Sequence, residues 1–486
     1  MRRRDFLKLS AIATLALALP KEAFAGDSSS DYKAIVVVYL TGGNDGLNMF
    51  IPSIDDENKG YPAYEKGREN LKVNNTPLTL PLNDEGNLDL SGGNPYNVDG
   101  DLDSAYTKGF YTHNGFDLAT NAIMPELAHL INKGKVAILS NAGNLIEPAT
   151  KEELLSGTKQ SPPFLFAHNH QKTLALNGIA SKLQYTGWAG RVYDLWQGVN
   201  GQSVYRLNIA INSNSHLFYG EKTEPLVVDA SGPKKYGWSI KREIYDNFLE
   251  IQTGDIFKDL YTKKQKHSFT LQDVLYDDWK NKSPEWKSKN AYGGELFSSP
   301  TDKQLQQNDV KAATSLLKNL EAVAKWSYIG KNNGLKRQIF YVSDSGYDTH
   351  GNQWVQHPKL LRGISLAIGD FYKALEDMQM QNDVTLMIIS DFGRTLGDNG
   401  NGTDHAWGNH YFVVGGAVKG GLYGELPTLI LGGKDDMGHK GRLIPTISMT
   451  QYYATILKWF GMNESELNAI LPELKNFEEN DLGFMG

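Results

Sequence analysis

The feature that most constrains this chain is an apolar run that ends abruptly in polar residues. Residues 34–40 are all apolar, and after Thr41 two glycines lead into Asn44, Asp45 and a third glycine. A short apolar run bounded by glycine is typical of a strand buried on both faces. In open α/β sheets, ligands bind just beyond the carboxyl ends of the strands. The pattern therefore predicts a buried strand followed by a tight turn that carries a carboxylate to a functional edge. The alternative is a turn in which Asn44 and Asp45 only cap the next segment.

Similar apolar runs recur along the chain and alternate with helical patterns. Strands are expected at residues 34–40, 135–141, 338–343, 384–390, 411–414 and 428–431, and helices at residues 124–131, 360–378 and 449–460. Strands that alternate with helices favour a mainly parallel sheet covered on both faces. Two stretches break the pattern: residues 52–120, rich in Gly, Asn, Asp and Pro, and residues 222–310, polar with scattered Trp and Tyr. Because no repeat or linker is visible, we expect one α/β domain over residues 26–486 that carries both stretches as insertions.

The first 25 residues have the composition of an export signal. Paired arginines precede Asp5, Phe6, Leu7 and Lys8, a short alanine-rich apolar stretch follows, and Ala-Phe-Ala ends at Ala25. This combination predicts a twin-arginine signal peptide, with the twin-arginine translocase as a partner and a periplasmic or secreted location. The apolar stretch is short for a membrane span, which needs roughly 20 apolar residues. No membrane span is expected in the mature chain, and a retained N-terminal anchor is the alternative.

Composition narrows the classes of function. The chain contains no cysteine, which excludes disulfides, thiolate nucleophiles and thiolate metal ligands. Its net charge of −7 becomes −10 without the first 25 residues, which carry five positive and two negative charges. An acidic chain is a poor candidate for nucleic-acid binding or for electrostatic attachment to anionic lipid. Twin-arginine export favours a folded protein with a metal or cofactor, held here by His, Asp, Glu or Asn.

Polar motifs at the ends of the predicted strands supply such ligands. Carboxylates and imidazoles follow or precede four of these strands, namely Asp45, Asp348, His350, Asp391 and His405. If the strand ends meet at one edge of the sheet, these side chains share one crevice. Without thiols, this set suits Zn²⁺, Mn²⁺ or a mixed site of one or two divalent ions. Two ions about 4 Å apart would clamp the oxygens of a phosphoryl or sulfuryl transfer, and the Arg394 guanidinium would bind the oxyanion.

Each motif also has a structural explanation. An aspartate after a strand commonly caps a turn, Asp348 with His350 fits an Asx turn that opens a helix, and two histidines near an aspartate arise easily by chance. The Trp and Tyr of residues 222–310 leave a carbohydrate-binding or polymer-handling module as a further alternative.

Taken together, the motifs resemble a known bacterial family. The signal and the motifs GGNDGLN (42–48), DTHGNQ (348–353), SDFGRT (390–395) and DHAWGNHYFVVGGAVKGG (404–421) resemble domain-of-unknown-function family 1501, with further matches at FAHNHQ (166–171) and TGWAGR (186–191). That family is similar to the alkaline phosphatase-like superfamily, which includes sulfatases and phosphodiesterases. The resemblance implies a three-layer α/β/α sandwich with a central, mainly parallel sheet and two metals at its carboxyl edge.

The resemblance also implies roles for individual residues. Asp45 resembles the first metal-binding aspartate of the superfamily, Asp391 the aspartate of its Asp-His pair, Asp348 and His350 the ligands of the other metal, and His405 the closing histidine. Asn44, Asn48, His168, Arg394 and His410 are expected to bind substrate, and His168 alternatively a metal. Two departures stand out: Phe392 occupies the position of a histidine ligand, and Ala167 stands where related sequences have serine. The nucleophile stays unknown.

We therefore expect an exported metal-dependent hydrolase of phosphate or sulfate esters of a small molecule or polymer. The alternative, favoured by Phe392 and Ala167, is a non-catalytic periplasmic or surface-assembly protein that retains the fold and a degenerate metal site.

Overall fold

The computed structural model describes residues 32–91, 108–201, 203–235, 240–251, 253–300 and 313–486. The predicted signal peptide, residues 1–25, lies outside the described residues. Within them, a nine-stranded sheet forms the centre of the molecule, with strand order β13-β5-β12-β9-β1-β8-β6-β7 and β14 paired to β5. These strands are β1 (Lys33–Thr41), β5 (Val136–Gly143), β6 (Asn208–Ile211), β7 (Leu226–Val228), β8 (Arg337–Ser345), β9 (Val384–Ser390), β12 (Asn409–Val414), β13 (Gly421–Tyr423) and β14 (Ile447–Ser448).

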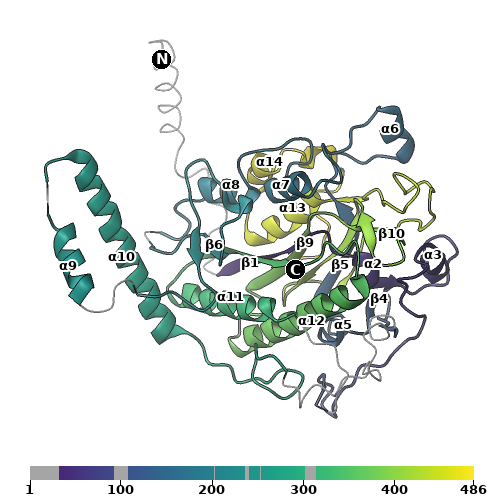
Figure 1. Ribbon diagram of the computed structural model, residues 1–486, viewed down its shortest axis with the longest axis horizontal. Helices are drawn as coiled ribbons and strands as arrows, with labels where there is room; N and C mark the ends of the chain where they lie inside the picture. The colour runs from purple at the N-terminus through teal and green to yellow at the C-terminus, as the bar shows by residue number, and fades with distance from the viewer. Residues whose placement is uncertain (1–31, 92–107, 202, 236–239, 252, 301–312) are drawn as a thin grey trace, which may run out of the picture.

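Helices cover both faces of this sheet (Figure 1). One layer contains α5 (Pro125–Asn132), α11 (Ser315–Asn332) and α12 (Gln353–Asp377), and the other contains α7 (His168–Asn177), α8 (Trp188–Leu195), α13 (Met449–Phe460) and α14 (Glu464–Ile470). Alternate residues of β1 divide between the two layers, because successive side chains of a strand point to opposite faces. Val36 and Val38 join the core of the first layer, and Ile35 and Val37 that of the second. The predicted α/β/α sandwich with a mainly parallel sheet is confirmed.

The register of the three central strands brings their ends together. Leu40 of β1 lies beside Asp344 of β8 on one side and beside Ser390 of β9 on the other, in parallel pairing. The three loops that follow therefore leave the sheet at one edge. Strand β12 is antiparallel to both β5 and β9, so it begins at this edge instead of ending there. The reversed direction of β12 is what places the preceding motif, with His405, beside the other three.

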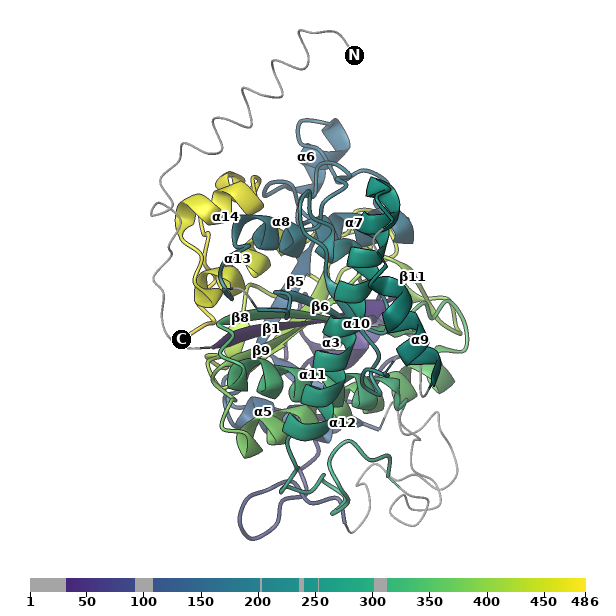
Figure 2. The ribbon, with the colours of Figure 1, turned by 90° about the vertical axis from the view of Figure 1, so that its left-hand side faces the viewer.

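The two predicted insertions contain regular structure of their own. In the first, β2 (Phe50–Pro52), β4 (Leu118–Asn121) and β3 (Phe110–Tyr111) form a small sheet beside α3 (Tyr61–Gly67). In the second, β7 extends the main sheet, and α9 (Ile240–Leu249) and α10 (Ile256–Lys282) form a helical hairpin. Figure 1 shows this hairpin projecting from the body of the molecule, and in Figure 2 it lies in front of the body, toward the viewer.

Smaller elements complete the fold. A two-stranded arm, β10 (Arg394–Asp398) with β11 (Thr403–His405), follows β9. Short helices are α2 (Gly46–Met49), α6 (Lys151–Ser156), η1 (His216–Phe218) and η2 (Leu474–Asn476). No helix in the described part of the chain is both long enough and apolar enough to cross a membrane.

Most of the predicted strands and helices are confirmed, but one strand is wrong. Residues 428–431 form no strand. The Asp435 carboxylate accepts hydrogen bonds from both the backbone and the side chain of Thr428, and the backbone N–H of Leu429 donates to the Asn58 carbonyl. Because side-chain and loop oxygens satisfy this backbone, the apolar segment does not pair with a strand. Helix α12 also begins at Gln353, seven residues before the expected start.

Candidate metal centre

Four segments bring a cluster of histidines and aspartates to the edge of the sheet. His168 is the first residue of α7, Asp348 lies in the loop between β8 and α12, Asp391 directly follows β9, and His405 ends β11. His168, Asp348 and His405 offer ligand atoms that all lie within 4.8 Å of one another. We call these three residues the His-Asp-His cluster. Its side chains are partly exposed, with 32% exposure at His168 and 20% at His405, so the cluster is open to solvent.

Each imidazole nitrogen lies about as far from one of the two Asp348 oxygens as two ligands of one small cation lie from each other. His168 Nε2 lies 3.4 Å from one Asp348 oxygen, and His405 Nε2 lies 3.2 Å from the other. A tetrahedral Zn²⁺ with bonds of about 2.0–2.1 Å separates its ligand atoms by about 3.3 Å. Two imidazole nitrogens and a carboxylate also form a common ligand set for catalytic zinc. The donor set and its spacing therefore fit a divalent cation.

Hydrogen bonds behind the cluster orient both imidazoles. His168 Nδ1 donates to Asp391 at 2.7 Å, and His405 Nδ1 donates to the Phe166 carbonyl at 2.9 Å. A proton on Nδ1 leaves the lone pair of Nε2 directed into the cluster, which is the arrangement that metal-binding histidines adopt. The Nε2 atom of His168 is buried and has no hydrogen-bond partner among the described residues. An unused acceptor of this kind fits the role of a metal ligand.

Asp391 is itself held firmly in place. The Tyr39 hydroxyl donates to one of its oxygens, and the backbone N–H of Gly42 donates to the other at 3.1 Å. Asp391 is 3% exposed, below the cluster. Its carboxylate therefore supports His168 from behind and does not face the open side of the cluster.

The pKa shifts of Asp348 and His405 favour the protonation states that a cation needs, whereas the shift of His168 favours the protonated imidazole. Burial lowers the pKa of His405, which keeps this imidazole neutral. Burial of Asp348 raises its pKa, but the hydrogen bond and charge of Arg394 outweigh that effect and lower it overall. The hydrogen bond to Asp391 raises the pKa of His168, against the effect of burial.

His350 lies at the exposed rim of the cluster. Its Nε2 is 2.7 Å from His405 Nε2 and 3.2 Å from Asp348, and its side chain is 45% exposed. Because the proton of His405 is on Nδ1, the Nε2–H of His350 is the donor in this pair. The role of His350 as a metal ligand stays a prediction.

Asp45 lies apart from the cluster, in a buried ion pair. Arg68 donates to both of its oxygens, Gln353 donates to it as well, and Asp45 and Arg68 are both fully buried. Burial raises the pKa of Asp45, but the Arg68 charge outweighs this and lowers it overall. The structure therefore joins Asp348 and His405 with His168, and places Asp391 behind them and Asp45 in a separate network.

Three of the residues predicted to bind substrate are buried and bond to other parts of the chain. Asn44, Asn48 and His410 are buried and bond to His357, Tyr64 and the Asn141 backbone, respectively. Burial lowers the pKa of His410 to about 4. Their role as substrate ligands stays a prediction.

Arg394 is buried beside the cluster and is fully engaged with the chain. Its guanidinium donates to Asp348 and to the carbonyls of Gly42, Gly43, Tyr347 and Thr403. These contacts join the loops that follow β1, β8 and β9. Arg394 therefore links the loops that surround the cluster, and its N–H groups donate to protein oxygens.

Several residues of this region carried no recognisable sequence signal. Arg68 lies in the first insertion, and Tyr39 belongs to a strand whose sequence is only apolar.

Two cations, Lys172 and Arg442, also lie beside the cluster: the Lys172 ammonium is over the Tyr39 ring, and Arg442 donates to the His405 carbonyl. Neither cation forms an ion pair with a carboxylate of the described residues. Lys172 follows His168 by one helical turn, a spacing that would have identified it once His168 was placed.

Phe392 packs against both imidazoles, whose own ring centroids lie 4.2 Å apart. Its ring centroid lies 4.9 Å from that of His168 and 4.7 Å from that of His405. An apolar ring here supports both imidazoles by packing but provides no ligand. Ala167, the residue before α7, likewise places no hydroxyl at the cluster.

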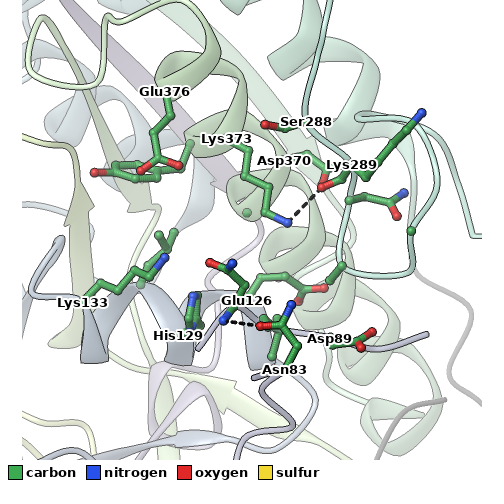
Figure 3. A pocket seen from close by; sticks show the side chains of 18 of the residues that line it. Asn83, Asp89, Glu126, His129, Lys133, Ser288, Lys289, Asp370, Lys373 and Glu376 are labelled. Atoms are coloured by element: carbon green, nitrogen blue, oxygen red, sulfur yellow. Dashed lines mark hydrogen bonds between the residues drawn. The ribbon is translucent and has the colours of Figure 1, made fainter. Parts of the chain in front are cut away.

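A separate cavity of about 490 Å³ lies elsewhere on the molecule, beside α5 and the second half of α12 (Figure 3). Titratable side chains line it, including His129, Lys133, Asp370, Lys373 and Glu376. The Asp370 carboxylate is buried and accepts the backbone N–H of Phe297 at 2.8 Å. Burial raises the pKa of Asp370 to about 7.

The raised pKa makes stability depend on pH in a defined direction. Between pH values of about 4 and 7, the folded protein keeps the Asp370 proton and the unfolded chain loses it. The contribution of Asp370 to the free energy of unfolding therefore falls by about 1.4 kcal/mol per pH unit over this range and is constant above it. Urea unfolding at pH 5 and pH 7 should show that Asp370→Asn loses less stability over this interval than wild type. Equal losses would contradict the assignment; Asp277→Asn, at an exposed site, is the control.

Comparison with known proteins supports one assignment. No curated protein matches the chain. Among solved structures, the lipoteichoic acid synthase LtaP from Listeria monocytogenes is 9% identical, with a TM-score of 0.33, over 92% of this chain and 76% of that one. Ps i-CgsB is 11% identical, with a TM-score of 0.32, over 73% of this chain and 71% of that one. At TM-scores this low, the likenesses support no inference about this chain. Residues 333–469, which include Asp348, Asp391 and His405, match the model of the family described as "Protein of unknown function (DUF1501)", and this match confirms the resemblance to that family over this part of the chain.

Proposed function

We propose that this protein is a metal-dependent hydrolase of phosphate or sulfate esters, with a divalent cation held by His168, Asp348 and His405. The observation that carries the proposal is the pair of imidazoles whose Nδ1 atoms are hydrogen-bonded outward while their Nε2 atoms face one carboxylate. Structural zinc sites are usually closed by four protein ligands, whereas three ligands and an open side are typical of catalytic sites. A bound Zn²⁺ or Mn²⁺ would polarise the ester and lower the pKa of a water molecule.

The surrounding side chains supply the other functions that ester hydrolysis needs. Lys172 and Arg442 are positioned to attract the anionic phosphate or sulfate group, since no described carboxylate pairs with either of them. His350, exposed at the rim, can give a proton to the leaving oxygen. Asp391 keeps the proton of His168 on Nδ1, and the Tyr39 hydroxyl fixes Asp391. Asp45, in contrast, is assigned a structural role through its pair with Arg68.

The proposal includes export by the twin-arginine route to the periplasm or beyond. It is supported by the paired arginines and the Ala-Phe-Ala sequence that ends at Ala25. Cell fractionation of the source bacterium checks the location, and recovery of the protein only from the cytoplasm would contradict it.

Metal analysis combined with a hydrolysis assay tests the function. We expect about one equivalent of Zn²⁺ or Mn²⁺ per chain, and metal-dependent release of nitrophenol from nitrophenyl phosphate or nitrophenyl sulfate. Lys172→Met and Arg442→Met should mainly raise KM, because they remove charges that bind the anion in both the ground state and the transition state. A folded protein that binds the metal but hydrolyses neither ester would favour the non-catalytic alternative. A protein that binds no divalent ion would contradict the proposed metal centre itself.

A further inference from the structure

The α9–α10 hairpin exposes a large amount of apolar surface. Of the 17 large apolar side chains exposed among the described residues, seven lie on this hairpin between positions 244 and 261. Phe257 is 85% exposed and Ile256 79%. The others are Ile244, Phe248, Ile251, Leu260 and Tyr261. Scattered apolar residues are normal on a protein surface, but a concentration of this kind indicates an interaction site.

These residues lie at the end of a projection. The base of α10 is anchored to the body, where Leu275 is buried and Trp279 packs against Trp326 of α11. Ile256 begins the helix 19 residues earlier, so it lies about 28 Å along the axis from Leu275, at 1.5 Å per residue. Figure 1 shows the end of α9 and the start of α10 extending away from the sheet and its covering helices. The apolar tip is therefore presented to something outside the molecule.

The hairpin is internally tied, so its tip is a defined surface. Tyr245 of α9 packs on Phe269 of α10, and Arg242 bonds to Asp273. Side chains on the inner faces of the two helices make these contacts. The apolar side chains exposed at the tip take no part in these contacts.

The charges at the tip are arranged asymmetrically. Its acidic groups are all used within the hairpin: Asp255 caps α10, Asp259 accepts the backbone N–H groups of residues 253 and 254, and Glu250 pairs with Lys266. Three lysines, Lys258, Lys263 and Lys264, have no acidic partner among the described residues. Hydrogen bonds to backbone N–H groups leave the carboxylate charges in place, so residues 250–266, with four lysines and three acidic side chains, carry a net charge of +1, although the chain as a whole is acidic.

Apolar and charged side chains share the first turns of α10: Asp255, Lys258 and Asp259 lie among the apolar residues, and Lys263 and Lys264 follow them. Residues 256–261 span about 8 Å of helix. Interfacial helices bury their apolar groups about 5–10 Å deep, with lysines at the level of the headgroups. Tyr261, which closes the apolar segment just before Lys263 and Lys264, is of the amphipathic type that favours the boundary.

We propose that the tip of the α9–α10 hairpin docks on a phospholipid bilayer that contains anionic lipid. The apolar side chains of Ile256, Phe257 and Leu260 enter the outer part of the acyl region, and Lys263 and Lys264 contact the headgroups. The acidic body stays about 28 Å or more away, beyond the screening length of about 8–10 Å at physiological salt.

Vesicle flotation of the full chain tests this proposal. Wild type should float with vesicles of phosphatidylcholine mixed with phosphatidylglycerol, and the double variant Ile256→Ser, Phe257→Ser should bind at least about 10-fold more weakly, because two large apolar groups no longer leave water. The matched control is Leu155→Ser with Tyr185→Ser, which alters two exposed apolar residues outside the hairpin. Lys263→Glu with Lys264→Glu should weaken binding only to vesicles that contain phosphatidylglycerol.

Because the altered side chains are exposed, the variants should keep the wild-type thermal unfolding curve. Equal flotation of wild type and the hairpin variants, or no flotation of wild type, would overturn the proposal. Light scattering without lipid gives a further decisive outcome: if wild type forms a dimer and the hairpin variants are monomers, the tip binds a second copy and the membrane assignment is wrong.

Discussion

Arg68→Met is expected to lower the free energy of unfolding by about 3–5 kcal/mol, because it leaves the Asp45 carboxylate buried without its counter-charge. Arg68 and Asp45 are both fully buried, and Arg68 also donates to the carbonyls of Thr395 and Leu396. These bonds connect the first insertion to the arm that follows β9. Urea unfolding monitored by circular dichroism measures the effect.

A second variant separates the charge from the packing. The double variant Asp45→Asn, Arg68→Met removes both charges and should be more stable than the sum of the single effects predicts, with a coupling of about 0.5–3 kcal/mol. Simple additivity would show that the ion pair itself contributes little.

The same variants decide between two roles for Asp45. If Asp45 is structural, Asp45→Asn keeps the wild-type affinity for Zn²⁺ under conditions where the protein is folded. If it is a metal ligand, as its motif predicts, the affinity falls with the ligand.

Removal of a ligand from the His-Asp-His cluster should have the second large effect. His168→Ala and His405→Ala are each expected to weaken Zn²⁺ binding by more than about 100-fold, since even changes to residues behind metal ligands cost about 10- to 100-fold. Asp391→Asn falls in that lower range, because it weakens the hydrogen bond that orients His168. Titration calorimetry with the metal measures all three.

The chain offers a matched control within the same helical turn. His170 is also in the first turn of α7, but it stacks on Phe164, with ring centroids 4.0 Å apart, and is not among the clustered ligands. His170→Ala should bind Zn²⁺ as wild type does. If His168→Ala kept wild-type affinity, or if His170→Ala lost as much, the ligand assignment would be wrong.

The fold was largely predictable because its central strands are apolar on both faces. Runs such as residues 34–40 and 384–390 have few stable alternatives to a buried parallel strand. Residues 428–431 show the limit of this argument: they are equally apolar, but Asp435 and Asn58 take up their backbone N–H groups in a loop. A contact between distant residues decided that segment.

The candidate site was only partly predictable. The motifs correctly brought Asp348, Asp391 and His405 to one edge, because the register aligns the ends of β1, β8 and β9. The motifs did not indicate which aspartate would be buried in an ion pair with an arginine. Arg68 reaches Asp45 from 23 positions away in an insertion without a regular pattern, and no local signal announces such a pair.

The sequence by itself determined the layered α/β architecture and the chemistry available to a site: carboxylates and imidazoles, without thiols. Periodicity and composition are local properties, so they can be read along the chain. Tertiary structure alone decided how those groups are used. The antiparallel direction of β12, the Arg68 pair and the start of α7 at His168 determine which side chains face one another, and each depends on packing between segments far apart in the chain.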